Sequence, residues 1–252
     1  MLAPFLLLAS AGFFQTTEVA QGRAIAAMNP GAALVLFERA LAHDSTSYEA
    51  TWRAAIALVD LAESAPADSL TPPRRDSVHV EAVQYARRAI ALSPDGADGH
   101  FALAVALGRT ALTKGKRERA RYAVEIYSEA TRVTELDSTH DGAQHVLGAW
   151  NAEIMRLSGF SRFFARNLLG ARVFGKASWE QAVSHLEASV RLDPTRIIHR
   201  LELARVYADR KRYADARREL AAIDGLTDKT VMDARYRLQA RELSADVKQK
   251  QD

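Results

Sequence analysis

The chain has 252 residues, of which 48% are hydrophobic and 26% charged, a composition typical of a folded protein with a sizeable core. Its formal net charge of +3 is too small to argue for a nucleic-acid partner. The absence of cysteine excludes disulfides, thiolate catalysis and cysteine-based zinc sites. Good helix formers are abundant and β-branched residues never alternate for long, so the sequence favours helices over strands.

Residues 1–14 predict a targeting segment. Leu2 to Phe14 is apolar apart from Ser10 and Gly12, and Ala9-Ser10-Ala11 fits a small-residue cleavage site. The run is shorter than the roughly 20 residues that span a bilayer. Because no lysine or arginine precedes it, a buried first helix is the alternative interpretation. We expect export to the periplasm or cell envelope if the segment is a signal peptide, and a cytoplasmic location otherwise.

From residue 15 onward the sequence repeats itself. Similar segments end in Asp, Ser or Pro after apolar or small residues spaced along one helix face, which is typical of the second helix of a hairpin. These segments are FERALAHDS (37–45), ARRAIALSP (86–94), ATRVTELDS (130–138), LEASVRLDP (186–194) and the degenerate LAAIDGLTD (220–228).

A first helix follows each of the first four stops. Three of these helices carry a large residue followed by a small one, which lets a neighbouring helix approach closely. The pairs are Leu103-Ala104, Leu147-Gly148 and Leu203-Ala204. The last unit matches the tetratricopeptide pattern at nearly every diagnostic position.

The spacing shows where the hairpins were extended. The stops at residues 45, 94, 138, 194 and 228 lie 49, 44, 56 and 34 residues apart, against a standard period of about 34. The additional residues fall between the first and second helices of three hairpins. They correspond to 64–78, to the basic run 115–122, and to part of the stretch 147–194.

Both ends of the repeat array are predicted to form capping helices. Residues 17–28 and 32–43 form a short first hairpin turned by Asn29-Pro30-Gly31, and a thin apolar stripe from Val231 to Leu238 predicts a terminal helix. We therefore predict an all-α, tetratricopeptide-type superhelix with extended hairpins. Residues 15–252 would form a single domain of about five hairpins plus a C-terminal capping helix.

Catalytic and cofactor motifs are weak. The segment 170–177 approaches a phosphate-binding loop, but Ala177 stands where Ser or Thr should hold magnesium, and helix rather than strand is predicted before it. The seven histidines form no HExxH motif, and there is no nucleophile elbow. We expect no enzyme activity, no metal and no cofactor.

The concave face of stacked hairpins is lined by their first helices, and large apolar residues lead most of the inward pairs. This pattern predicts a groove for a hydrophobic ligand, either a lipid chain or an apolar helix. The alternative is a groove filled by the long inserts. The predicted groove residues are Trp52, Ile56, Phe101, Val105, His145, Trp150, Glu153, Leu201 and Arg205.

An aromatic and basic segment follows the helix that carries Trp150. Leu157, Phe160, Phe164 and Leu168 share one face, and arginines lie largely off it. The pattern indicates either contact with a membrane or an acidic partner, or an aromatic face packed in the core with solvated arginines. The candidate contact residues are Arg156, Phe160, Arg162, Phe164 and Arg166.

The string LGxWxxEIxxLS at 147–158, with Trp52-Arg53 and His100-Phe101-Ala102, resembles the regulator of microtubule dynamics family. The resemblance covers roughly residues 17–240 and suggests a bacterial relative. It implies a tetratricopeptide fold and a non-catalytic binding role, since members are linked to microtubules and one branch binds phospholipid.

The predicted function is accordingly a non-catalytic module that binds a hydrophobic ligand or a protein partner in its groove. The alternative is a structural adaptor in an exported envelope complex with no small ligand. We expect a protein or lipid partner, with peripheral membrane contact as a further candidate role and no nucleic acid.

Overall fold

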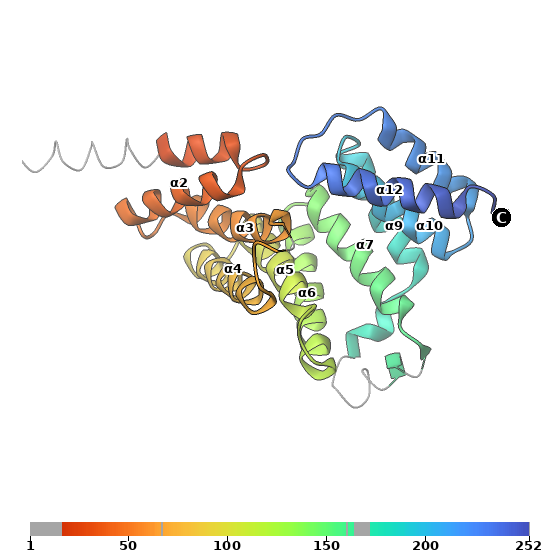
Figure 1. Ribbon diagram of the computed structural model, residues 1–252. Helices are drawn as coiled ribbons and strands as arrows, with labels where there is room; N and C mark the ends of the chain where they lie inside the picture. Colours follow the sequence, from red (N-terminus) through yellow and green to blue (C-terminus); the bar gives the residue numbers. More distant parts are fainter. Residues whose placement is uncertain (1–16, 67, 160, 164–171, 252) are drawn as a thin grey trace, which may run out of the picture. The chain divides into compact units, whose positions relative to one another are not determined.

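The computed structural model describes residues 17–66, 68–159, 161–163 and 172–251, and over these residues the chain is helical without strands (Figure 1). The prediction of an all-α fold built from helical hairpins is confirmed. The targeting segment 1–14 lies outside the described residues. No helix in the described part of the chain is long and apolar enough to cross a membrane.

The chain divides into two compact units, one ending at Thr113 and the other starting at Lys114. This boundary falls inside the third predicted hairpin, between its first and second helices. That residues 15–252 form one domain stays a prediction.

The first unit contains a helical segment over residues 17–25, followed by α2 (Pro30–His43), α3 (Tyr48–Ser64), α4 (Pro72–Leu92) and α5 (Ala97–Ala111). Helix α2 begins two residues earlier than predicted. Asn29 is its N-cap, and the side chain accepts a hydrogen bond from the Ala32 amide at 3.1 Å. Pro30 fits the first turn because its missing amide hydrogen is not needed there.

Small residues let the helices of this unit pack closely. Ala33, Phe37 and Ala40 of α2 are fully buried against Ala50 and Ala54 of α3. Helices α3, α4 and α5 pack on one another in the same unit.

The second unit contains α6 (Lys116–Leu136), α7 (Asp141–Arg156), the short 3-10 helix η1 (Arg172–Lys176), α9 (Trp179–Leu192), α10 (Ile197–Asp209), α11 (Tyr213–Asp224) and α12 (Asp233–Val247). Helix α12 packs against α10 and α11, as the predicted terminal helix should. The core centres on α9, α10 and α11, where Leu186, Leu201 and Ile223 are at most 1% exposed.

Three of the five stops predicted from the repeats share one local structure. Asp44, Asp137 and Asp193 each end a helix, and each carboxylate accepts hydrogen bonds from the amide and hydroxyl of the threonine two residues later. The threonine contacts lower the pKa of Asp137 below its ordinary value. Because this Asp-x-Thr turn binds the chain to itself, it stops the helix without tertiary contacts.

Most residues of the first two inserts extend the second helix of their own hairpin. Residues 72–78 of the first insert form the start of α4, while Gly115 caps α6 and residues 116–122 form its first turns. Helices α4 and α6 therefore have 21 residues each, against 12 in α11.

Candidate binding face of the first helices

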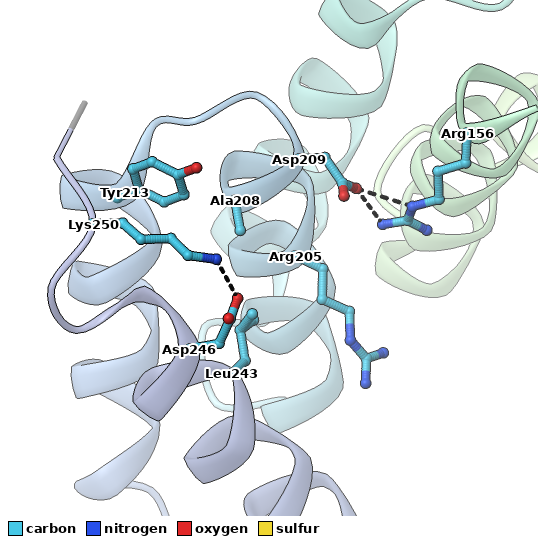
Figure 2. Close-up of a pocket in the computed structure, with 8 residues that line it drawn as sticks. All are labelled: Arg156, Arg205, Ala208, Asp209, Tyr213, Leu243, Asp246 and Lys250. Atoms are coloured by element: carbon cyan, nitrogen blue, oxygen red, sulfur yellow. Dashed lines mark hydrogen bonds and ion pairs between the residues drawn. The ribbon is translucent and has the colours of Figure 1, made fainter. Parts of the chain in front are cut away.

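A cavity of about 410 Å³ opens on the first-helix side of the second unit. Helices α7, α10 and α12, together with the start of α11, contribute its lining. The lining residues are Arg156, Arg205, Ala208, Asp209, Tyr213, Leu243, Asp246 and Lys250 (Figure 2).

Arg156 joins α7 to α10 at the edge of this cavity. Its Nε and Nη2 atoms donate to the same carboxylate oxygen of Asp209, at 2.9 and 2.7 Å, and Figure 2 shows the two groups facing each other. Nη1 donates to Glu153 at 2.5 Å and to Glu202 at 3.3 Å. Burial alone would lower the pKa of Arg156, but the carboxylates of Glu202 and Asp209 raise it above its ordinary value.

Glu202 is the buried anchor of the charged lining. Its side chain is only 10% exposed and pairs with Arg156 and Arg205. Arg205 donates to Glu202 at 3.0 Å and to Gln239 of α12 at 2.9 Å, so it connects α10 with α12. Sequence reasoning missed Glu202, although a glutamate between Leu201 and Leu203 in a buried helix was an available signal.

Residues just beyond α12 complete the cavity. The Lys250 ammonium donates to Asp246 at 2.8 Å and lies 5.7 Å from the Tyr213 ring centroid. Arg217 donates to the backbone carbonyls of Val247 and Lys250. These contacts hold the segment after α12 beside Tyr213.

A second polar cluster joins the N-terminal parts of α7 and α10. The His199 side chain, 2% exposed, donates from Nε2 to Asp141 at 2.7 Å. Its Nδ1 atom lies 3.2 Å from Nδ1 of His145, and the two rings are tilted by 34° with centroids 5.0 Å apart. The hydrogen bond from His199 lowers the pKa of Asp141 to about 2.

Two residues predicted to line the groove are core residues instead. Trp150 is 5% exposed and packs among Tyr127 of α6 and Phe174 of η1. Leu201 is fully buried in the core cluster that α10 forms with α9 and α11. The other predicted groove residues of this unit are His145, partly exposed beside His199; Arg205, which lines the cavity; and Glu153, whose side chain is 69% exposed.

In the first unit, the four predicted groove residues remain partly exposed. Trp52 and Ile56 lie one turn apart on α3, and Phe101 and Val105 do so on α5, which packs against α3. The Arg53 guanidinium lies over the Trp52 ring at 4.2 Å. This unit therefore keeps an aromatic and aliphatic face on its first helices.

The residues predicted to touch a membrane or an acidic partner are placed differently. Arg156 forms ion pairs with three carboxylates within the chain, so its contact with a membrane or an acidic partner stays a prediction. Arg162 donates to the carbonyls of Met155 and Leu157 and thereby caps the end of α7. Phe160, Phe164 and Arg166 lie outside the described residues.

Metal-binding geometry is absent from residues 17–66, 68–159, 161–163 and 172–251, which hold no group of three or more His, Asp or Glu side chains that could hold an ion. The described part of the near-miss phosphate loop, Arg172–Lys176, is a single 3-10 helix rather than a strand-to-helix turn.

The helical hairpins and the face formed by their first helices define a helical-repeat protein of the tetratricopeptide type. A tetratricopeptide protein from Thermus thermophilus is similar over 92% of this chain and 99% of its own, with a TM-score of 0.64 and 19% identity. PilF of Pseudomonas aeruginosa is similar over 95% of this chain and 92% of its own, with a TM-score of 0.55 and 15% identity. These likenesses establish the fold.

The chain belongs to the family described as Regulator of microtubule dynamics protein 1-3, whose model matches residues 18–248. A search of curated proteins returned no match. The family resemblance predicted from residues 147–158 is thereby confirmed.

Proposed function

We propose that this protein is a non-catalytic module that binds a segment of a partner protein on the first-helix face of its second unit. The observation that carries the proposal is the cavity lined by α7, α10 and α12. Its volume of about 410 Å³ lies in the range of ligand sites, and the concave sides of helical repeats are binding surfaces.

The chemistry of the lining supports a polypeptide over a lipid chain. Five of the eight lining residues are charged, and covering them with an acyl chain would remove their hydration without replacing it. Each cation already has a carboxylate partner, so the lining is close to neutral. A polypeptide offers both donors and acceptors and can exchange with such pairs.

The first unit supports a separate apolar contact. The partly exposed Trp52, Ile56, Phe101 and Val105 would suit the hydrophobic face of a partner helix. The predicted hydrophobic ligand is therefore best matched by this apolar face of the first unit. A polar contact in the second unit and an apolar contact in the first unit would together also suit the structural adaptor, which is the alternative function predicted from the sequence.

Native mass spectrometry of the protein purified from its natural source tests the choice of ligand class. We expect a stoichiometric protein partner that dissociates when Arg205→Glu reverses a lining charge. Co-purified phospholipid in a one-to-one complex, with no protein partner, would contradict the proposal and favour the lipid alternative.

Export of the chain through residues 1–14 is a proposal of its own. The mass of the mature protein from its natural source tests it, since a signal peptide would be missing from an exported product. A mature protein that keeps Met1 would contradict export.

A further inference from the structure

The first turns of α6 and the short helix η1 carry a concentration of positive charge that the proposed function does not use. Segments 116–121 and 172–176 contain six cations and one acid, a net charge of +5. The whole chain is +3, so all other residues together sum to −2. We call the exposed cations of these segments the α6 patch; they are Lys116, Arg117, Arg119, Arg121, Arg172 and Lys176.

An aromatic cluster brings the two parts of the patch together. Trp150 of α7 donates from Nε1 to the Ala123 carbonyl of α6 at 2.7 Å, and its ring packs edge-on against Phe174 of η1. Lys176 at the end of η1 lies 5.9 Å from the centroid of Tyr127 on α6. Residues about fifty positions apart in the sequence therefore meet at one aromatic cluster.

The placement of these cations works against the stability of α6. The N-terminus of a helix carries partial positive charge and favours Asp or Glu, yet the first turns of α6 hold one acid, Glu118, against the three cations Lys116, Arg117 and Arg119. Arg117 and Arg121 are four residues apart, where like charges repel across a helix turn. No side-chain cap compensates, because Gly115 is the N-cap. Local rules broken in this way point to a functional site.

We propose that the α6 patch is a docking surface for an anionic phospholipid membrane. The positive charge of the patch favours an anionic partner, and the exposed shape of the helix end favours a membrane among anionic partners. The consecutive residues Lys116 to Arg119 go once round the helix and are all exposed, so the cations of this helix end point in several directions, which suits a broad anionic surface better than a single peptide strand. The cavity of the first-helix face includes none of the patch residues.

The aromatic rings beside the cations fit the same occupant. Arg121 lies 5.3 Å from the centroid of the half-buried Tyr122, and Tyr127 lies under Lys176. Tyrosine rings are favoured at the headgroup level of a bilayer, where one end is apolar and the other wet. Basic side chains near an anionic leaflet bind additively and lose that binding in salt.

Vesicle co-sedimentation of the full chain tests the proposal. The probes are vesicles of phosphatidylcholine alone and of phosphatidylcholine with phosphatidylglycerol. We expect binding only to the anionic vesicles at low ionic strength, and its loss at about 0.5 M salt. The triple variant Lys116→Glu, Arg117→Glu, Arg121→Glu should bind on the order of a hundredfold less.

A matched triple variant controls for net charge. Arg39→Glu, Arg235→Glu and Arg241→Glu change the charge equally at exposed positions outside the patch, and this variant should keep most of the binding. Thermal unfolding checks folding, and the patch variant should be at least as stable as the parent because glutamate is favoured at a helix N-terminus.

Three results would overturn the proposal. One is equal binding to neutral and anionic vesicles, and another is an equal loss in both triple variants. The third is binding to soluble polyglutamate without binding to anionic vesicles, which would make the patch a site for an acidic protein. None of these depends on the first-helix cavity, so the proposed function stands or falls separately.

Discussion

The indole nitrogen of Trp150 donates a hydrogen bond to the backbone carbonyl of Ala123 at 2.7 Å, and this contact fastens α7 to α6. Phe174 and Ile154 close the same cluster. The tryptophan of the family string is thus a packing residue, and its mutation should affect stability before binding.

Trp150→Phe should lower the free energy of unfolding by about 2 kcal/mol, because the hydrogen bond and part of the buried ring are lost. Urea unfolding followed by circular dichroism measures this. Trp52→Phe is the control at a partly exposed tryptophan, with an expected loss below about 1 kcal/mol. Equal losses in the two variants would show that Trp150 is not a core residue.

Gly148 and Gly108 form a second matched pair. A Cβ atom at Gly148 would lie 2.5 Å from Leu186 Cγ and 3.1 Å from the Ala182 carbonyl oxygen, whereas one at Gly108 would meet nothing within 4 Å. Gly148→Ala should therefore destabilise the protein by about 1–3 kcal/mol. Gly108→Ala should stabilise it by up to about 1 kcal/mol, since alanine favours helix. Thermal unfolding that ranks the two in the opposite order would refute the close approach of α7 and α9.

The hydrogen bond between His199 and Asp141 predicts an acid-dependent stability. The pKa of Asp141 is about 2 in the folded protein, against 3.8 ordinarily. A depressed carboxyl pKa stabilises the fold above the unfolded value, and this stabilisation is lost as pH falls from about 4 to about 2. The stability difference between the parent and Asp141→Asn should be constant near neutral pH and shrink in that acid range. A difference that does not change with pH would contradict the assignment.

Arg156→Lys tests the connection between α7 and α10. Lysine keeps the charge but cannot form the forked contact with Asp209 while also reaching Glu202. We expect a loss of about 1–3 kcal/mol, because Glu202 is left buried with one partner fewer. Urea unfolding checks this, with Arg235→Lys at an exposed site of α12 as the control. A change as small as that of the control would mean that the network contributes little.

The sequence was sufficient to predict the hairpins because their ends are determined locally. Each Asp-x-Thr stop makes its own turn, and the small residue of each large-small pair is a property of one helix. Gly148 illustrates this, since its contact with Leu186 is the close approach that the Leu147-Gly148 pair predicts.

The site could be predicted only in part because exposure depends on neighbours that are remote in the sequence. The repeat register placed Leu201 toward the groove and the family string singled out Trp150, but α9 covers the former and η1 and α6 cover the latter. Glu202 escaped notice because its role needs Arg156, which lies on another helix. Arg205 lines the cavity, but its hydrogen bond to Gln239 of α12 could not be predicted from the repeat pattern.

Site-specific photo-crosslinking tests most directly whether a partner protein occupies the cavity on the first-helix face of the second unit. The chain has no cysteine, so a single cysteine can carry a photoreactive group at Ala208 in the cavity or at the exposed Ser184 of the second helix α9. In cells that naturally make the protein, we predict one discrete protein adduct from position 208, absent at 184 and lost with Arg205→Glu. The same adduct from both positions, or phospholipid as the only adduct at 208, would contradict the account.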